Sequence, residues 1–153
     1  MGIVSFVFDK ISAEKTGKIK EKVDISHNFN IKHVEKTEIN IQGNKPALKL
    51  SFDFTVNYEP NIGNIKMNGN LTYMDKPEEL KKLEDQWKKE KKLPVGVTSL
   101  VANTILTKAN IKALMLSQEV NLPPQIHLPK VTPREEDSKI TQKETEDKGD
   151  YIG

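Results

Sequence analysis

Apolar and polar residues alternate along much of the first half of the chain, which is the two-residue period of a β-strand. The clearest alternation covers residues 47–59, and residues 65–73 repeat it. The apolar positions are Leu48, Leu50, Phe52, Phe54, Val56 and Tyr58 in the first segment and Ile65, Met67, Leu71 and Tyr73 in the second. Each segment is therefore expected to be a strand with one buried and one wet face, as in an antiparallel sheet.

Two further strands are expected closer to the N-terminus. Their apolar residues are Val4, Phe6 and Phe8 in the first and Val23, Ile25, Phe29 and Ile31 in the second, where the pattern resumes at Ile39 and Ile41. Gly, Asn and Pro at residues 42–46 and 59–64 favour short turns, so hairpins should join the last three strands. Residues 12–22 form either a longer connection or a bent continuation of the first strand.

The period changes to that of a helix at residues 75–94. The apolar residues of this segment, Leu80, Leu83 and Trp87, fall on one narrow stripe, so the helix should lie on the outside of the body. Asp75 is a candidate N-cap, and Pro77 suits the first turn. Most of the lysines gather toward the C-terminal end, and we interpret the charges as a solvated face.

A second helix is expected over residues 95–120, and apolar side chains surround most of it. They are Val97, Leu100, Val101, Ile105, Leu106, Ala109, Ala113, Leu114 and Leu116, with a thin polar strip at Ser99, Asn103, Thr107, Asn110 and Ser117. A helix that lies on one sheet needs an apolar stripe of only about 100°. This helix offers more, which predicts a second apolar neighbour.

We infer that the second neighbour is another copy of the chain, which makes the protein a homo-oligomer, a dimer or a tetramer. If these apolar side chains stayed in water, each would lose the roughly 1.5 to 3 kcal/mol of stabilisation that burial provides. The residues expected at this interface are Val97, Leu100, Val101, Ile105 and Leu106. The alternative, a helix that is central within its own chain, stays open.

Residues 121–129, with the sequence NLPPQIHLP, follow this helix and cannot continue it. Proline lacks an amide hydrogen and biases the preceding residue toward extended conformations. In an extended strap, the side chains of Leu122, Pro124, Ile126 and Leu128 share one side, and Gln125 and His127 take the other. The strap either borders a groove or closes the core beneath it.

Beyond the strap the composition becomes charged and poor in apolar residues. From Arg134 to Gly153 there are seven acidic and four basic residues, a net charge of −3, whereas the whole chain carries +2. Such a segment buries too little surface to offset its ordering entropy. We therefore expect one domain over residues 1–131 and a charged, disordered tail over residues 132–153.

Composition narrows the possible classes of protein. The chain contains no cysteine, which excludes disulfides and zinc-thiolate sites. A net charge of only +2 does not point to nucleic acid or to an anionic membrane. No apolar run approaches the roughly 18 residues that span a bilayer, and the first residues lack the features of a signal peptide. A cytoplasmic location is expected.

Candidate catalytic residues are sparse. His27 and His33 stand on one extended strand and are about 20 Å apart, too far for one metal or one proton relay. His127 is alone on the strap. The sequence has no Gly-rich phosphate loop after a strand, no GxSxG motif and no carboxylates at metal-ligand spacing. We therefore expect no enzyme activity, no cofactor and no metal.

The order of these elements resembles the SecB family of export chaperones. The most specific piece is the apolar helix that runs into NLPPQIHLPKV, residues 121–131, which is similar to the Pro-rich crossover of that family. The resemblance implies an α+β fold, a four-stranded antiparallel sheet with one or two helices packed on one face. It also implies long apolar grooves, bordered by the strap, that hold unfolded chains. By this resemblance the client-binding residues are Leu114, Met115, Leu122, Pro123, Pro124, Ile126 and Leu128.

The expected function is therefore that of a molecular chaperone, a holdase that binds unfolded or partly folded polypeptides. Two alternatives remain. One is a structural or adaptor subunit of the same fold. The other is a nucleic-acid-binding module that uses the Lys-rich helix, for which affinity would fall steeply with salt.

Overall fold

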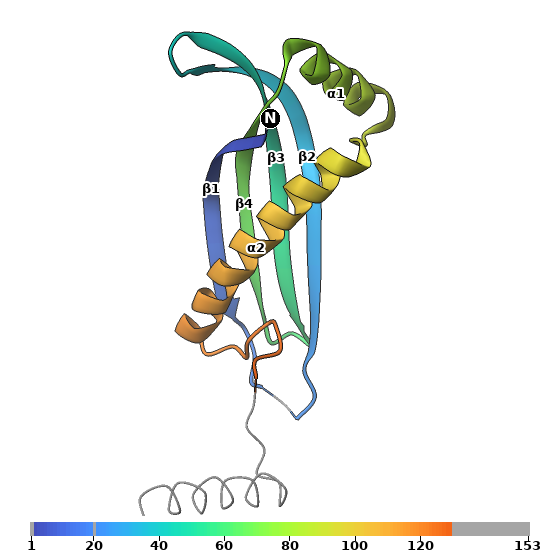
Figure 1. Ribbon diagram of the computed structural model, residues 1–153. Coiled ribbons are helices and arrows are strands. Elements are labelled where there is room, and N and C mark those ends of the chain that lie inside the picture. Colours follow the sequence, from blue (N-terminus) through green and yellow to red (C-terminus); the bar gives the residue numbers. More distant parts are fainter. Residues whose placement is uncertain (1, 20, 130–153) are drawn as a thin grey trace, which may run out of the picture.

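The computed structural model describes residues 2–19 and 21–129. It contains β1 (Gly2–Lys15), β2 (Asp24–Asn40), β3 (Asn44–Glu59), β4 (Gly63–Met74), α1 (Pro77–Glu90) and α2 (Val95–Glu119). The strands form one four-stranded antiparallel sheet in the order β1-β4-β3-β2, which leaves β1 and β2 at the edges. Helix α2 crosses one face of the sheet diagonally, and α1 lies near one end of it (Figure 1). The α+β prediction is confirmed, while the predicted tail, residues 132–153, lies outside the described residues.

The two central strands follow the alternation of the sequence. In β3 the even-numbered residues from Leu48 to Tyr58 are buried, and the odd-numbered residues between them are only partly covered. Their partners on β4 share the same face, for example Ile65 opposite Val56 and Leu71 opposite Leu50. The opposite face of these strands carries Asn, Thr, Ser, Lys and Asp side chains. One face therefore builds the core and the other faces solvent.

Strand β2 changes its phase at a bulge. Ile31 lies opposite Phe52, but the register then shifts, and Val34 lies opposite Leu50. An extra residue in one strand moves the core face from odd to even positions. Val34 is consequently buried, and Ile39, opposite Lys45, no longer continues the apolar face of Ile31. A pattern of period two cannot reveal this shift.

Strand β1 extends to Lys15, so the bent continuation of the first strand is the correct alternative for residues 12–15. Its register against β4 shifts twice, between Ile3 and Ser5 and between Phe8 and Lys10. At Gly69 of β4, a Cβ atom would lie 2.1 Å from the carbonyl oxygen of Val7. Only glycine therefore allows the edge strand to approach this closely.

The core has two parts along the sheet. At one end, the sheet packs against the apolar stripe of α1 and the first half of α2, including Trp87, Val101 and Ile105. At the other end, Ala109 and Ala113 lie over the aromatic and aliphatic residues of β3 and β4. Because alanine is small, the second half of α2 can lie close to the sheet.

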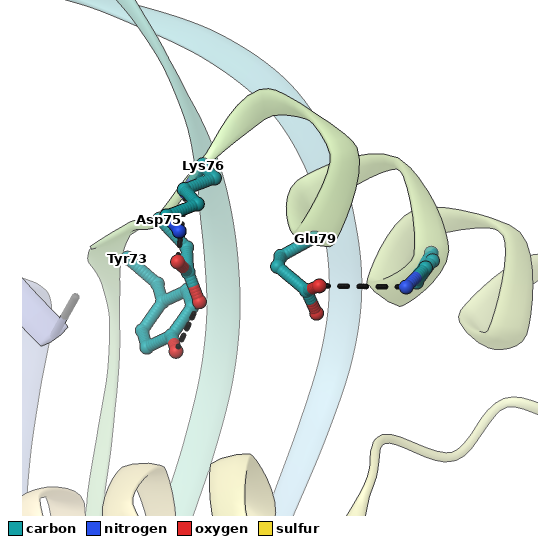
Figure 2. A network of polar contacts seen from close by, with 5 residues as sticks. Tyr73, Asp75, Lys76 and Glu79 are labelled. Atoms are coloured by element: carbon teal, nitrogen blue, oxygen red, sulfur yellow. Dashed lines mark hydrogen bonds and ion pairs between the residues drawn. The ribbon is translucent and has the colours of Figure 1, made fainter.

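The start of α1 differs from the prediction of an Asp75 N-cap. The helix begins at Pro77, and its N-cap residue, Lys76, makes no side-chain capping bond. The Asp75 carboxylate instead accepts hydrogen bonds from the Lys76 amide at 2.7 Å and from the Tyr73 hydroxyl at 3.2 Å (Figure 2). Asp75 stands one residue too early for a cap, so its contacts fix the junction between β4 and the helix.

A buried carboxylate ties α1 to the sheet. Glu84 accepts a hydrogen bond from Lys88 at 2.8 Å and pairs with Lys36 of β2 at 3.8 Å. Lys36 and Lys88 are largely exposed, whereas the Glu84 side chain is buried. On the exposed part of the helix, Lys82 donates to Glu79 at 3.4 Å (Figure 2).

Candidate functional site

Helix α2 buries a single row of side chains. The row consists of Val101, Ile105, Ala109, Ala113 and Ser117, one residue in every four. A row at this spacing winds slowly round the helix, which matches its diagonal path over the sheet. Ser117, predicted on a polar strip, belongs to this row, and its hydroxyl donates to the Leu114 carbonyl at 2.8 Å.

The buried row corrects part of the predicted subunit interface. Val101 and Ile105 are fully buried against the sheet of their own chain, so their side chains are not available to a second copy. Leu100 is exposed, while Val97 and Leu106 are half-buried. Of the predicted interface, only these three side chains are open to a partner.

The opposite side of α2 presents an uncovered apolar surface. Leu100, Ile111 and Met115 are exposed by 42%, 60% and 54%, and we call them the outer stripe. Thr104 lies on the same side by helical spacing, and its hydroxyl donates to the Leu100 carbonyl at 2.8 Å. Exposed Thr107 and Lys108 precede Ile111 by four and three positions, so polar side chains separate Leu100 from Ile111 and Met115 on this side.

The end of α2 sets the path of the strap. Asn121 has a φ of 58°, a left-handed conformation that asparagine tolerates. The amide of Leu122 donates to the Ser117 carbonyl at 2.8 Å, and the amide of Asn121 donates to the Gln118 carbonyl at 3.3 Å. This is the bonding pattern of a Schellman motif, which satisfies the last carbonyls of a helix and reverses the chain.

Leu122, predicted to bind clients, is part of the core. Its side chain is buried among Tyr58, Ile62 and their neighbours. A Cβ at Gly63 would lie 3.1 Å from the Leu122 side chain, so the glycine makes room for it. Leu122 therefore anchors the strap and is not open to a client in this structure.

Two hydrogen bonds hold the strap against the body. The Tyr58 hydroxyl donates to the Pro123 carbonyl at 2.8 Å, and the Gln125 side-chain amide donates to the Asn110 carbonyl at 2.7 Å. Burial raises the pKa of Tyr58 from 10.0 to about 12, so the hydroxyl stays protonated, and remains a donor, further into the alkaline range. The strap is thus fixed to both the sheet and α2.

The predicted sides of the strap are wrong at Leu122 and His127. Leu122 is buried although Pro124, Ile126 and Leu128 of its predicted side are exposed, and His127 is exposed although Gln125 of its predicted side is buried. Gln125 is buried, whereas Ile126 and Leu128 are exposed by 41% and 44%. The chain bends at Gln125 and Ile126, and the buried amide finds its partner on α2, as buried polar groups generally must. Pro123 is half-buried and Pro124 is exposed.

The remaining predicted client-binding residues divide between two sides of α2. The strap contacts α2 at Asn110, and half-buried Leu114 lies one turn further along that flank. Met115 projects about 140° round the helix from Asn110, so it belongs to the outer stripe and not to the strap side. The structure therefore brings Leu114 close to the flank that holds the strap and separates Met115 from it.

Beside the outer stripe, the exposed surface of α2 carries uncharged polar residues such as Ser99, Asn103 and Thr107, and few charges. Between Val95 and Gln118 the helix carries two lysines, Lys108 and Lys112, and no carboxylate. Within residues 2–19 and 21–129, no three His, Asp or Glu residues gather in a group that could hold a metal ion. None of the helices in that part of the chain is long and apolar enough to cross a bilayer.

A second feature was missed by the sequence interpretation. A pocket of 390 Å³ lies where β2, the end of α1 and the start of α2 meet, and its wall includes Phe29, Ile31, Trp87 and Leu93. One local feature of the sequence could have indicated this pocket. It is the turn between the helices, KKLP at residues 91–94, which places two lysines next to an apolar residue.

The chain matches no known family model and no curated protein sequence. Its fold is similar to that of the SecB-like chaperone Rv1957 of Mycobacterium tuberculosis, solved in complex with a ChAD peptide from the Rv1956 HigA1 antitoxin. The two chains are 13% identical, the likeness covers 85% of this chain and 88% of that one, and the TM-score is 0.52. At this identity the likeness concerns the fold, a four-stranded antiparallel sheet with helices on one face.

Proposed function

We propose that this protein is a chaperone of the SecB-like kind, which holds unfolded or partly folded polypeptides on an apolar surface. The fold supports the proposal, since a protein of similar fold is named a SecB-like chaperone and was solved with a bound peptide. The apolar side chains that α2 and the strap leave uncovered support it independently.

The outer stripe is the observation that carries the proposal. Its three side chains are each about half exposed or more, although full burial of such a side chain contributes roughly 1.5 to 3 kcal/mol. Contact of this kind requires apolar groups but no particular sequence, which suits non-native polypeptides. Met115 adds an unbranched thioether side chain that adapts to different partners.

Self-association is part of the proposal. Leu100 and half-buried Val97 lie in the first half of α2, and Leu106 follows. We assign these three residues to contact with a second copy, in a dimer or tetramer. Ile111, Met115 and Leu114, together with Ile126 and Leu128 of the strap, form the part assigned to clients. The protein is proposed to act in the cytoplasm, without a cofactor and without catalysing a reaction.

Suppression of aggregation tests this function. The purified protein, mixed with a chemically denatured client at near-stoichiometric amounts, is expected to reduce the light scattered when the client is diluted from denaturant. Met115→Glu should weaken the protection, because it places a carboxylate in the apolar contact. Lys66→Glu is the matched control, since Lys66 is exposed on the polar face of the sheet. Absence of protection by the wild-type protein even at large molar excess would end the proposal.

A further inference from the structure

The pocket beside α1 is built mainly from apolar side chains of three elements. Phe29 and Ile31 come from β2, Trp87 from α1, and Leu93 and Val95 from the turn and the start of α2. Its volume of 390 Å³ falls in the range of about 300 to 1,000 Å³ typical of ligand pockets. Val95 is 83% exposed at its mouth, so the pocket is open to a partner.

The charged residues that line this pocket are both lysines. Lys91 and Lys92 line it, and none of its lining residues is acidic. The Lys91 ammonium lies 5.6 Å from the centre of the Trp87 ring. By contrast, the hollow between α1 and the β2–β3 hairpin contains Glu38 and Glu84 beside its two lysines. The first pocket therefore favours an apolar group with carboxylates next to it.

An edge strand runs along the same pocket. β2 has β3 on one side and, within the described residues, no strand on the other. Phe29, Asn30 and Ile31 of this strand all line the pocket. An extended polypeptide can pair with the free edge of a sheet and place alternate side chains into pockets beside it. This geometry suits a polypeptide better than a compact small molecule.

We propose that this pocket binds one large apolar or aromatic side chain of an extended polypeptide, at a position flanked by Asp or Glu. The inference rests on the proposed function and deepens it, because it names a class of client segment. The apolar side chain packs against Trp87 and Leu93, the peptide backbone lies along β2, and the flanking carboxylates face Lys91 and Lys92. The outer stripe selects for apolar character alone, whereas this pocket adds a preference for negative charge.

Peptide binding tests the inference on the full-length protein. The probe is a fluorescein-labelled, Trp-free peptide with a central Phe between Asp and Glu residues, compared with a peptide that has Lys in their place. We expect the acidic peptide to bind more tightly by anisotropy. It should also change the emission of Trp87, the only tryptophan of the chain.

Charge reversal provides the matched pair of variants. Lys92→Glu should weaken binding of the acidic peptide about three- to tenfold, because repulsion replaces an exposed attraction. Lys45→Glu makes the same change on β3, where it pairs with Ile39 of β2 beside the hairpin turn, and should leave the affinity unchanged.

Three outcomes would overturn the inference. The first is equal affinity for the acidic and the Lys-flanked peptide, which leaves the proposed chaperone function intact. The second is binding that is lost in Ile111→Asp but unchanged in Lys92→Glu, which places the peptide on the outer stripe. The third is no binding of either peptide while the protein still suppresses aggregation.

Discussion

Two isoleucines of α2 allow folding and client binding to be separated. Ile105 is fully buried in the core, whereas Ile111, on the next turns of the same helix, is 60% exposed on the outer stripe. Ile111→Asp should change the free energy of unfolding by less than about 1 kcal/mol, because the site is exposed and Asp costs only a few tenths in helix propensity. Ile105→Val removes a buried methylene and should cost about 0.5 to 1.5 kcal/mol.

For client binding we expect the opposite order, a large effect of Ile111→Asp and none of Ile105→Val. If a client covers the exposed part of Ile111, that contact contributes about 1 to 2 kcal/mol, so Ile111→Asp should raise the Kd about 5- to 30-fold. Ile105→Val should leave the Kd unchanged while the protein is folded. Urea unfolding followed by circular dichroism gives the stabilities, and anisotropy of a labelled, denatured client gives the affinities. Unchanged binding by Ile111→Asp, or an equal loss in Ile105→Val, would refute the assignment of the outer stripe.

Three further predictions concern the strap and the assembly. Tyr58→Phe removes the hydroxyl that donates to the Pro123 carbonyl and should lower the free energy of unfolding by about 0.5 to 1.5 kcal/mol in urea denaturation; no loss would show that the bond does not hold the strap. Because burial raises the pKa of Tyr58 from 10.0 to about 12, its neutral form contributes stability that is complete below pH 10 and lost as the pH rises through 12. Between pH 10 and 12 the free energy of unfolding should therefore fall more steeply for the wild type than for Tyr58→Phe. Curves of equal slope for the two proteins would show that ionisation of Tyr58 does not cause the fall. Leu100→Asp should reduce the molar mass measured by light scattering, whereas an unchanged oligomer would exclude Leu100 from the interface.

The regular strands were predictable because one face of each is buried along its whole length. Burial of every second residue of β3, from Leu48 to Tyr58, is what the alternation in the sequence predicts. β2 was only partly predictable, because the bulge after Ile31 exchanges the faces and makes Val34 a core residue. The bulge depends on pairing with β3, and no local residue pattern marks it.

The site was predictable in outline but not in detail. The sequence showed that α2 has more apolar surface than one sheet can cover, and the outer stripe is exposed as that excess requires. It did not show which residues face inward. The path of the helix over the sheet decides that Val101, Ile105 and Ser117 are buried, and the sequence does not contain that path. Leu122 was assigned to clients by the resemblance to the SecB family, whereas the Schellman motif in this chain is followed by a Leu122 side chain that lies in the core.

Site-specific cross-linking tests the central claim, that Ile111 and Met115 of the outer stripe hold non-native polypeptide. The chain has no cysteine, so a photoreactive group can be attached at Ile111→Cys alone and, as a control, at Lys66→Cys on the polar face of the sheet. With a denatured client present, we predict covalent adducts from position 111 and few from position 66. Equal adducts from both positions, or none from position 111 while aggregation is still suppressed, would contradict it.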